Sequence, residues 1–410
     1  MTKRKLIGPF RQLLTMANLP DRGPLKDEQL EIIPEAGILI ENEKIIAVGS
    51  FKVLKQKHPK VSKEIIREDM VALPGWIDAH THICFAGSRA KDYAARNNGK
   101  SYLEIAKAGG GIRSTVLHTR AAEASKLFDL TMQRLDRHLK NGVTTVEIKS
   151  GYGLGVEEEL KQLRVIKQAD QKHAADVVST CLAAHIIPNE FKDATSYLAQ
   201  VQAELVPRIL NEKLTHRFDI FIEDTAFTPE IAKPYLSFLR EKGFQLTVHG
   251  DQFSRGGSQV AIDCGAVSVD HLEASGEQEI KALAQSKTIP VALPGASIGL
   301  GCSFAPARKL LDAGCALAIA SDWNPGSAPQ GNLLAQAAIL GAFEQLSAAE
   351  VFAGLSFRAA QALQLFDRGT LVSGKMADII AFPTEHFSEI LYHQGMLKVK
   401  KVWKKGQIVE

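Results

Sequence analysis

The stretch LPGWIDAHTH, residues 73–82, decides how the rest of the chain is interpreted. An apolar run leads directly into His80 and His82, and side chains at positions i and i+2 of a strand point to the same face. Both imidazoles can therefore reach one metal ion. Because the motif is short, two hydrogen-bonded histidines at a strand end stay an equally open alternative until further ligands are found.

Seven more short apolar runs follow this one, and helical patterns such as Val156–Ala169, Pro229–Lys242 and Glu277–Gln285 separate them. Alternating strands and helices are typical of a parallel sheet, and eight such units predict an α/β fold with a (β/α)8 TIM-like barrel. The eight runs are Ala72–His80, Val143–Ile148, Asp176–His185, Phe218–Glu223, Gln245–His249, Val267–His271, Ile289–Leu293 and Ala316–Asp322.

Six of the eight runs end in a residue that can bind a metal or carry a proton. These residues are His80, His185, Glu223, His249, His271 and Asp322. In a barrel of this kind the active site lies at the C-terminal ends of the strands, so the six side chains are expected at one mouth.

Asp322 follows mostly apolar residues, and burial of a lone carboxylate is costly, so it needs a partner or solvent. Together with His80, His82 and His249 it would suit zinc or iron and leave a position open for water. His271 could be a ligand or a proton shuttle, because its ordinary pKa lies near neutrality.

The two ends of the chain show a different pattern from the middle. A hairpin is predicted over residues 37–49, and strand-like runs return at Ala377–Phe382 and Val399–Trp403. We therefore expect a small β-sandwich domain formed by both termini, residues 1–72 plus 370–410, beside a catalytic barrel over residues 73–369.

Composition excludes several classes of protein. With 45% hydrophobic and 23% charged residues, the composition is typical of a globular protein. A length of 410 residues is too great for one small core and favours one large domain with a smaller companion. A net charge of +3 does not indicate a nucleic-acid partner. The basic tail Lys398–Lys405 alternates with apolar residues and is interpreted as a solvated strand face.

The five cysteines are scattered and include no Cys-x-x-Cys pair, which argues against a disulfide framework or a structural zinc site. No run reaches the roughly 18 apolar residues of a membrane-spanning helix, and no signal peptide is recognised. We therefore expect a cytoplasmic protein with no membrane partner.

Several polar residues lie in the predicted loops after the strands: Arg89, Tyr152, His185, Asn324 and Ser327. An arginine in such a loop offers a two-pronged fork for a carboxylate, although a surface ion pair is the ordinary alternative.

Seven stretches between Leu73 and Ser327 carry a resemblance to a known family. They are LPGWIDAHTHICFAGSRA, AGGGIRSTV, VEIKSGYGL, AAHIIPNEF, HGDQFS, SVDHLE and SDWNPGS. Together they resemble the imidazolonepropionase branch of the amidohydrolase superfamily. The His-x-His pair marks only the superfamily, whereas SGYGL, AAHIIP and SDWNPGS are more specific.

The resemblance implies one divalent metal ion, zinc or iron, and hydrolysis of the cyclic amide of 4-imidazolone-5-propanoate to N-formimidoyl-L-glutamate, the third step of histidine degradation. The implied ligands are His80, His82, His249 and Asp322. The implied substrate contacts are Arg89, Tyr152, His185 and Gln252, with Asn324, Gly326 and Ser327 near the product end. A homodimer is also implied.

The resemblance makes His271 the catalytic histidine. Some relatives carry Glu at the position of Gln252, and an amide cannot accept a proton at neutral pH. The proton transfers are therefore expected to fall on His271 and Asp322.

Three alternatives stay open at this point. Glu223 and Asp224 lie about where relatives with two metals carry a bridging residue, although one metal is favoured. The chain could be another amidohydrolase, such as a deaminase of a purine or guanidine-like ring. It could also be a barrel without catalytic activity that acts as a binding or scaffold protein.

Overall fold

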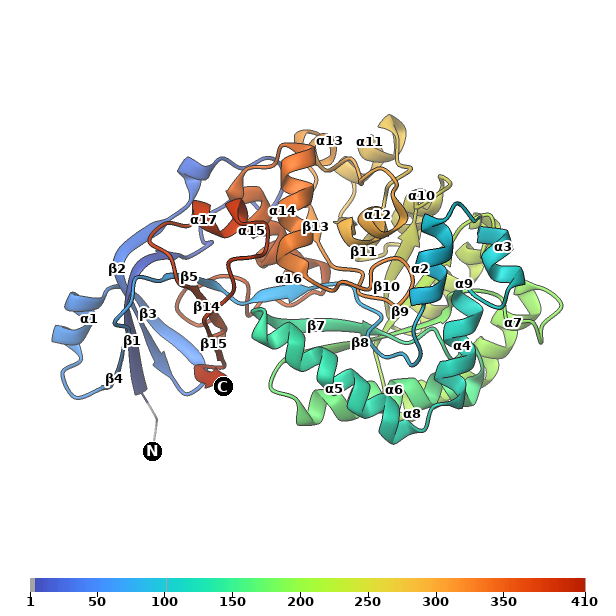
Figure 1. Ribbon diagram of the computed structural model, residues 1–410, viewed down its shortest axis with the longest axis horizontal. Coiled ribbons are helices and arrows are strands. Elements are labelled where there is room, and N and C mark those ends of the chain that lie inside the picture. Colours follow the sequence, from blue (N-terminus) through green and yellow to red (C-terminus); the bar gives the residue numbers. More distant parts are fainter. Residues whose placement is uncertain (1–3, 101, 410) are drawn as a thin grey trace.

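The computed structural model describes residues 4–100 and 102–409, and two sheets of eight strands organise it (Figure 1). One is the predicted parallel barrel, which is confirmed, since each predicted run overlaps one of its strands in the order of the chain. The barrel strands are β6 (Trp76–Asp78), β7 (Val143–Lys149), β8 (Asp176–Ala184), β9 (Arg217–Ile222), β10 (Gln245–Gly250), β11 (Ser268–His271), β12 (Ile289–Ala292) and β13 (Ala318–Ile319).

Backbone contacts just beyond β6 and β13 join the first and last strands. Thr81 forms a parallel bridge with Trp323, and the His82 N–H donates to the Trp323 carbonyl at 3.0 Å. The Asp322 N–H donates to the His80 carbonyl at 3.1 Å. Closure of the barrel therefore brings the first two predicted ligands beside the last one.

Helices cover the outside of the barrel, and the three helical patterns predicted from the sequence are confirmed. Helix α5 shows why these segments form helices that pack on the barrel. Its residues Leu127, Thr131, Leu135 and His138 recur at helical spacing and are all buried. The covering helices are α5 (Ala124–Lys140), α6 (Val156–Lys172), α7 (Ala194–Gln200), the π-helical turn η2 (Val201–Leu205), α8 (Val206–Glu212), α9 (Pro229–Glu241), α10 (Gly257–Asp263), α11 (Glu277–Gln285), α12 (Pro294–Leu300), α13 (Ala307–Asp312), α14 (Leu333–Glu344), α15 (Ala348–Leu355) and α16 (Phe357–Ala362).

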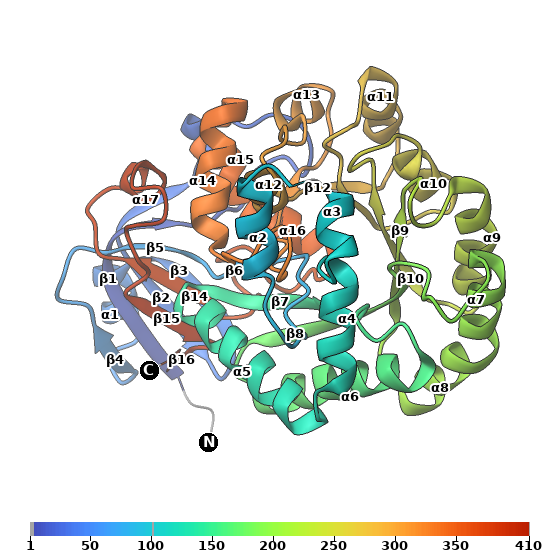
Figure 2. The same cartoon turned by 45° about the vertical axis from the view of Figure 1, so that its right-hand side comes forward.

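A long excursion between β6 and α5 forms three further helices, α2 (Ala90–Asn97), α3 (Tyr102–Lys107) and α4 (Ile112–Ala121) (Figure 2). Helix α2 buries none of its residues. Polar contacts hold it instead, including a hydrogen bond of 2.9 Å from Arg96 Nη2 to the Gly299 carbonyl.

Both ends of the chain build the second sheet, as predicted, and N and C lie on the same side of the molecule in Figure 1. Its order is β16-β15-β14-β5-β1-β2-β3, with β4 paired to β1. The strands are β1 (Arg4–Leu14), β2 (Ile32–Glu41), β3 (Lys44–Ser50), β4 (Ser62–Ile65), β5 (Val71–Pro74), β14 (Ile379–Phe382), β15 (Lys401–Lys404) and β16 (Gln407–Val409). Short helices η1 (Asp27–Gln29), α1 (Phe51–Lys57) and α17 (Ser388–Tyr392) complete the chain.

The terminal sheet encloses its own core. Trp403 of β15 meets Phe10 of β1 edge to face at 5.8 Å, and its Nε1 donates to Glu64 of β4, although β15 pairs with neither strand. The two halves of the sheet therefore face each other across a core, as a sandwich requires. The predicted domain boundaries stay a prediction.

The first predicted run is divided between the two sheets, because β5 belongs to the terminal sheet and β6 to the barrel. Gly75 lies between them. A Cβ there would lie 2.3 Å from Oγ1 of Thr144, so only glycine lets the chain pass this point.

The solvated-face interpretation of the basic tail is wrong for Lys404. Lys398 and Lys400 are exposed, but Lys404 is only 4% exposed. Its Nζ lies 2.6 Å from Asp378 Oδ2 and 2.7 Å from Asp176 Oδ2. Alternation predicts which face a side chain occupies, but it does not show that Asp176, at the start of barrel strand β8, lies against that face.

All five cysteines are free, and four of them are buried. Among the described residues, no helix has the length and apolar character needed to cross a membrane.

Candidate active site and metal centre

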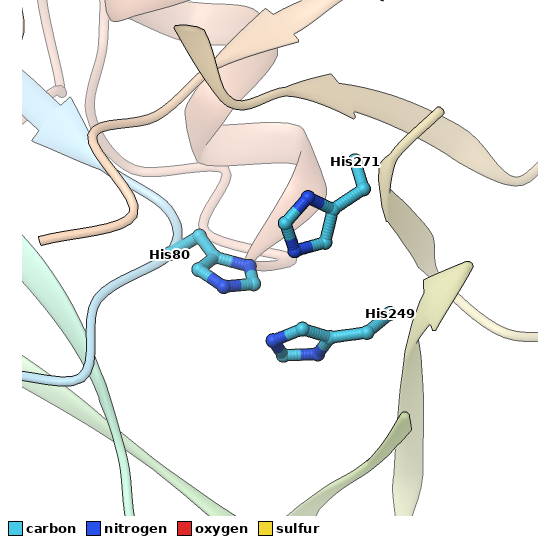
Figure 3. A group of neighbouring side chains, drawn as sticks. All are labelled: His80, His249 and His271. Atoms are coloured by element: carbon cyan, nitrogen blue, oxygen red, sulfur yellow. The ribbon is translucent and has the colours of Figure 1, made fainter. Parts of the chain in front are cut away.

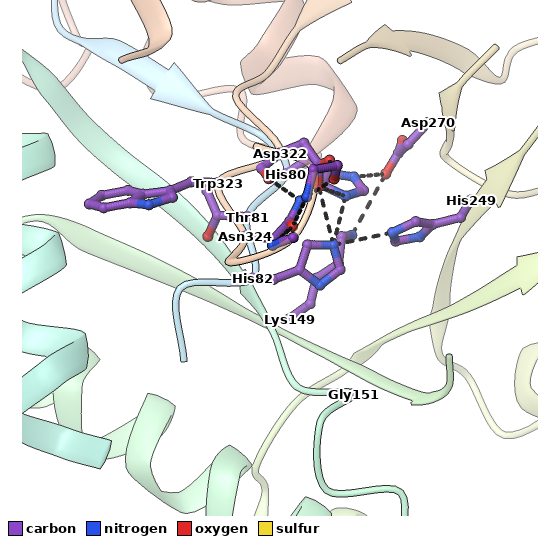
Figure 4. Close-up of polar contacts among 12 residues, drawn as sticks. His80, Thr81, His82, Lys149, Gly151, His249, Asp270, Asp322, Trp323 and Asn324 are labelled. Carbon is purple, nitrogen blue, oxygen red and sulfur yellow. Dashed lines mark hydrogen bonds and ion pairs between the residues drawn. The ribbon is translucent and has the colours of Figure 1, made fainter. Parts of the chain in front are cut away.

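The four predicted ligands meet at the barrel mouth (Figure 4). His82 Nε2 lies 3.1 Å from His80 Nε2 and 3.3 Å from His249 Nε2. Asp322 Oδ1 lies 3.5 Å from His80 Nε2 and 3.4 Å from His82 Nε2. None of the four residues is more than 3% exposed.

These distances fit a metal ion. A tetrahedral ion with bonds of about 2.0–2.1 Å to nitrogen and oxygen holds its ligand atoms about 3.4 Å apart. The four distances given above range from 3.1 to 3.5 Å, and they link each ligand atom to at least one other.

The chemistry of the donor atoms agrees with the spacing. His80 Nδ1 lies 2.6 Å from Asp270 Oδ2, and His249 Nδ1 lies 2.9 Å from Asp219 Oδ2. A carboxylate at Nδ1 keeps the ring hydrogen there and leaves a lone pair on Nε2. Two such lone pairs face His82 Nε2, which can donate at most one hydrogen, so a shared cation explains the cluster better than hydrogen bonds.

His80 and His82 are also in the protonation state that binds metal. Burial lowers the pKa of His80 well below its usual range, and burial together with His80 does the same to the pKa of His82. A neutral imidazole is the form that coordinates a cation.

A buried charge cluster lies next to these ligands, and the sequence interpretation missed it. Figure 4 shows two of its members, Lys149 and Asp270. Lys149 Nζ lies 2.8 Å from Glu147 Oε1, 2.8 Å from Asp219 Oδ2 and 3.6 Å from Asp270 Oδ2. All four residues are at most 1% exposed. The available signal was a charged residue inside an otherwise apolar strand, as in VTTVEIK and RFDIFI.

His271 closes another side of the cluster (Figure 3). One ring nitrogen each of His80, His249 and His271 lie within 4.8 Å of one another. His271 Nδ1 lies 3.3 Å from Glu273 Oε2. Burial acts to lower the pKa of His271, but the carboxylates of Glu273 and Asp322 outweigh it, and the net pKa is raised.

Two of these side chains come from strained backbone. His271 has φ of 88° and Asp322 has φ of 51°, in the left-handed region that residues other than glycine rarely adopt. Such strain costs of order 1–3 kcal/mol and is concentrated at functional sites.

Tyr152 and His185 form an aromatic wall beside His82. The His185 ring stacks on His82 at 5.4 Å and 22°, and the Tyr152 ring lies 5.5 Å from His185. His185 Nδ1 lies 3.0 Å from the Gly151 carbonyl. Burial and the neighbouring His249 lower the pKa of His185 to about 3, so its ring is neutral.

The segment after β13 lies between Asp322 and Arg89, whose Nε pairs with Asp92 Oδ2 at 2.8 Å. A Cβ on Gly326 would lie 2.3 Å from Arg89 Nη1, so glycine makes room for the guanidinium. Asn324 Oδ1 accepts from the N–H groups of Gly326 and Ser327 at 2.7 and 2.8 Å. Ser327 Oγ donates to Asp322 Oδ2 at 3.2 Å.

Gln252 and Glu223 are less closely connected to the ligands. Gln252 lies in the loop after β10 and is partly exposed, and no hydrogen bond or ion pair among the described residues ties its side chain to the cluster. Glu223 accepts from the Phe253 N–H at 2.9 Å and from Ser254 Oγ at 2.6 Å. Its carboxylate therefore holds this loop, and Asp224 is exposed.

Comparisons with known proteins agree with this site. Residues 71–409 match the sequence pattern of the amidohydrolase family. The imidazolonepropionase of Geobacillus sp. (strain WCH70) is 37% identical, with 97% of this chain and 96% of that protein covered. That of Bdellovibrio bacteriovorus is 40% identical, with 94% and 91% covered.

Solved structures share the fold. A triazine hydrolase variant has a TM-score of 0.72 at 18% identity, with 99% of this chain and 94% of that chain covered. An adenosine deaminase from Xanthomonas campestris with bound zinc has a TM-score of 0.70 at 18% identity, with 98% and 92% covered.

Proposed function

The chain belongs to the amidohydrolase family, and we propose that the cluster at the barrel mouth hydrolyses the cyclic amide of 4-imidazolone-5-propanoate to N-formimidoyl-L-glutamate. One observation carries this proposal: relatives named imidazolonepropionase match nearly the whole chain, and the side chains expected for that reaction converge on one buried site.

We propose one divalent ion, zinc or iron, held by His80, His82, His249 and Asp322. The spacing of the four ligand atoms supports it, and the zinc bound to the Xanthomonas deaminase occurs in the same fold. When bound, such an ion polarises the carbonyl group and lowers the pKa of water from about 16 to about 7. Glu223 is already used by the loop after β10, which supports a single metal.

Asp322 would move the proton, and His271 would stabilise the developing charge. Asp322 accepts the proton of the attacking water, because its carboxylate lies beside the histidines that would hold the ion. His271 keeps its own proton because its pKa is raised, so it can donate a hydrogen bond to the carbonyl oxygen as negative charge develops there. The carbon–nitrogen bond then breaks, and the ring nitrogen leaves with the proton that Asp322 took.

The remaining residues would orient the substrate. The Arg89 guanidinium binds the propionate carboxylate, and Tyr152 and His185 lie along the imidazolone ring. Gln252 can hydrogen-bond the ring but cannot take a proton. Asn324, Gly326 and Ser327 form the side of the site from which the opened product would leave.

The same relationship supports a cytoplasmic homodimer that acts on a small molecule. The deaminase alternative has less support, because the adenosine deaminase neighbour is only 18% identical and shares the fold alone. The scaffold alternative does not explain why the neutral His80 and His82 are buried with their ring nitrogens facing each other.

Metal analysis paired with an activity assay tests the proposal. The purified protein should contain about one equivalent of zinc or iron and should turn over 4-imidazolone-5-propanoate but not adenosine or guanine. A protein with metal that leaves the imidazolone intact would overturn the substrate, and a protein that retains no metal would overturn the metal site.

A further inference from the structure

One buried lysine lies between the carboxylates that hold two of the ligand histidines. Lys149 Nζ lies 2.8 Å from Asp219 Oδ2 and 3.6 Å from Asp270 Oδ2, and Lys149 is fully buried. Asp219 contacts His249 Nδ1 at 2.9 Å, and Asp270 contacts His80 Nδ1 at 2.6 Å.

The third partner of Lys149 leads to the remaining histidine. Glu147 Oε1 lies 2.8 Å from Lys149 Nζ, and Glu147 Oε2 accepts from the Thr81 N–H at 3.3 Å. Thr81 stands between His80 and His82 in the sequence. Lys149 is therefore connected to His249 through Asp219, to His80 through Asp270, and to the segment that carries His82 through Glu147.

We propose that Lys149 is a positioning residue that holds these carboxylates together and thereby sets the affinity of the site for its metal ion. This inference rests on the metal site of the proposed function. In the described part of the chain, Lys149 Nζ forms no hydrogen bond or ion pair with the four ligands; it acts through Asp270, Asp219 and Glu147.

The physical reason is the repulsion among buried charges. Three carboxylates at most 1% exposed cannot be separated by water, and each would otherwise push the others away. An ammonium in contact with all three offsets this repulsion and fixes their positions. Burial alone would lower the pKa of Lys149, but the carboxylates of Asp219 and Glu147 raise it by more. The net pKa is therefore raised, and the ammonium keeps its charge.

Removal of the ammonium should therefore rotate the histidines and not only loosen the fold. With Lys149→Met the carboxylates would move apart, and each would carry the ring that it orients with it. Loss of a carboxylate that orients a ligand histidine costs about 10–100-fold in metal affinity in other metal sites, and loss of Lys149 would displace two such carboxylates.

The chain offers a matched control in Lys404. This lysine is 4% exposed and also lies between two carboxylates, at 2.6 Å from Asp378 and 2.7 Å from Asp176. Neither carboxylate contacts a histidine in the described part of the chain. Lys404→Met therefore removes a buried lysine with the same kind of partners but without a connection to the ligands.

The test measures zinc affinity of the full-length protein by competition with a chromophoric chelator, alongside thermal unfolding of the metal-free form. Both variants should unfold at lower temperature than wild type. Lys149→Met should bind zinc about 10–100-fold more weakly, whereas Lys404→Met should stay within about twofold of wild type.

Charge-conserving and charge-removing variants keep the test decisive if Lys149→Met does not fold. Lys149→Gln keeps hydrogen-bond donors but removes the charge, and Lys149→Arg keeps the charge. We expect weak zinc binding for the glutamine variant and partial recovery for the arginine variant. Wild-type zinc affinity in Lys149→Met or Lys149→Gln would overturn the role of Lys149, whereas a wild-type protein that binds no zinc would instead overturn the metal site itself.

Discussion

Lys149 and Lys404 lie at opposite ends of the barrel, and Lys404 reaches its end from β15 of the terminal sheet. Lys149 ends β7 at the mouth, whereas Lys404 contacts Asp176, the first residue of β8, where the terminal sheet joins the barrel. We call the second region the domain joint, and define it by Lys404, Asp378, Asp176 and Arg368. Both lysines are buried among carboxylates, so burial of charge does not by itself distinguish a functional residue from a structural one.

The difference lies in what the carboxylates contact next. At the mouth, Asp219 and Asp270 continue to histidines that face one another. At the joint, Asp176 contacts Arg368 at 2.5 Å, and Asp378 accepts from the Lys405 backbone N–H at 2.9 Å. In barrels of this type the C-terminal ends of the strands serve chemistry and the N-terminal ends serve stability, and the two clusters follow that division.

The largest difference between the regions should come from a ligand at the mouth. His249→Ala removes one of four metal ligands, and we expect kcat/KM to fall at least about 10³-fold, because the lost electrostatic stabilisation is worth several kcal/mol. Asp378→Asn at the joint is the control. Its kcat/KM should stay near wild type while urea unfolding shows a lower free energy of unfolding. Comparable activity losses in the two variants would contradict the division between a catalytic mouth and a stabilising domain joint.

The next effect should come from the arginines of the two regions. Arg89→Ala should raise KM about 10–100-fold with a smaller change in kcat, because a charge-assisted contact to the substrate carboxylate is worth about 1.5–3 kcal/mol. Arg368→Ala at the joint loses contacts to Asp176 and Asp367 and should change stability but not KM. Steady-state kinetics decide this, and an unchanged KM for Arg89→Ala would remove its assigned role.

The smallest effect should be a shift in pH dependence. Because His271 has a raised pKa and works in its protonated form, activity is present below that pKa and is lost as pH rises through it. Glu273→Gln removes the carboxylate that raises this pKa, so the alkaline limb of kcat should move to lower pH. The control is Glu389→Gln, which removes the partner of His393 in an exposed pair and should leave the pH profile in place. If the alkaline limb of Glu273→Gln stays at the wild-type pH, the limb belongs to a group other than His271.

Much of the fold could be predicted because its signals are local. Apolar runs such as Val143–Ile148 alternate with helical patterns, and the parallel barrel follows from that alternation. The division of the first run between two sheets could not be predicted, since it depends on the close approach of Thr144 to Gly75.

The site shows the same limit. His80, His82, His249 and Asp322 could be named from the ends of predicted strands. Asp219, Asp270 and Lys149 were missed, because a charged residue in an apolar strand does not reveal which distant strand will supply its partner. Lys404 was misinterpreted for that reason.

By itself, therefore, the sequence determined the order of the strands and which side chains stand at their C-terminal ends, because both follow from periodicity along the chain. Only the tertiary structure decided which buried charges meet. The partners of Lys149 lie in β7, β9 and β11, and the register of those strands brings them to within 3.6 Å of one nitrogen. Electrostatic energy depends on such distances between strands, and no spacing along the sequence specifies them.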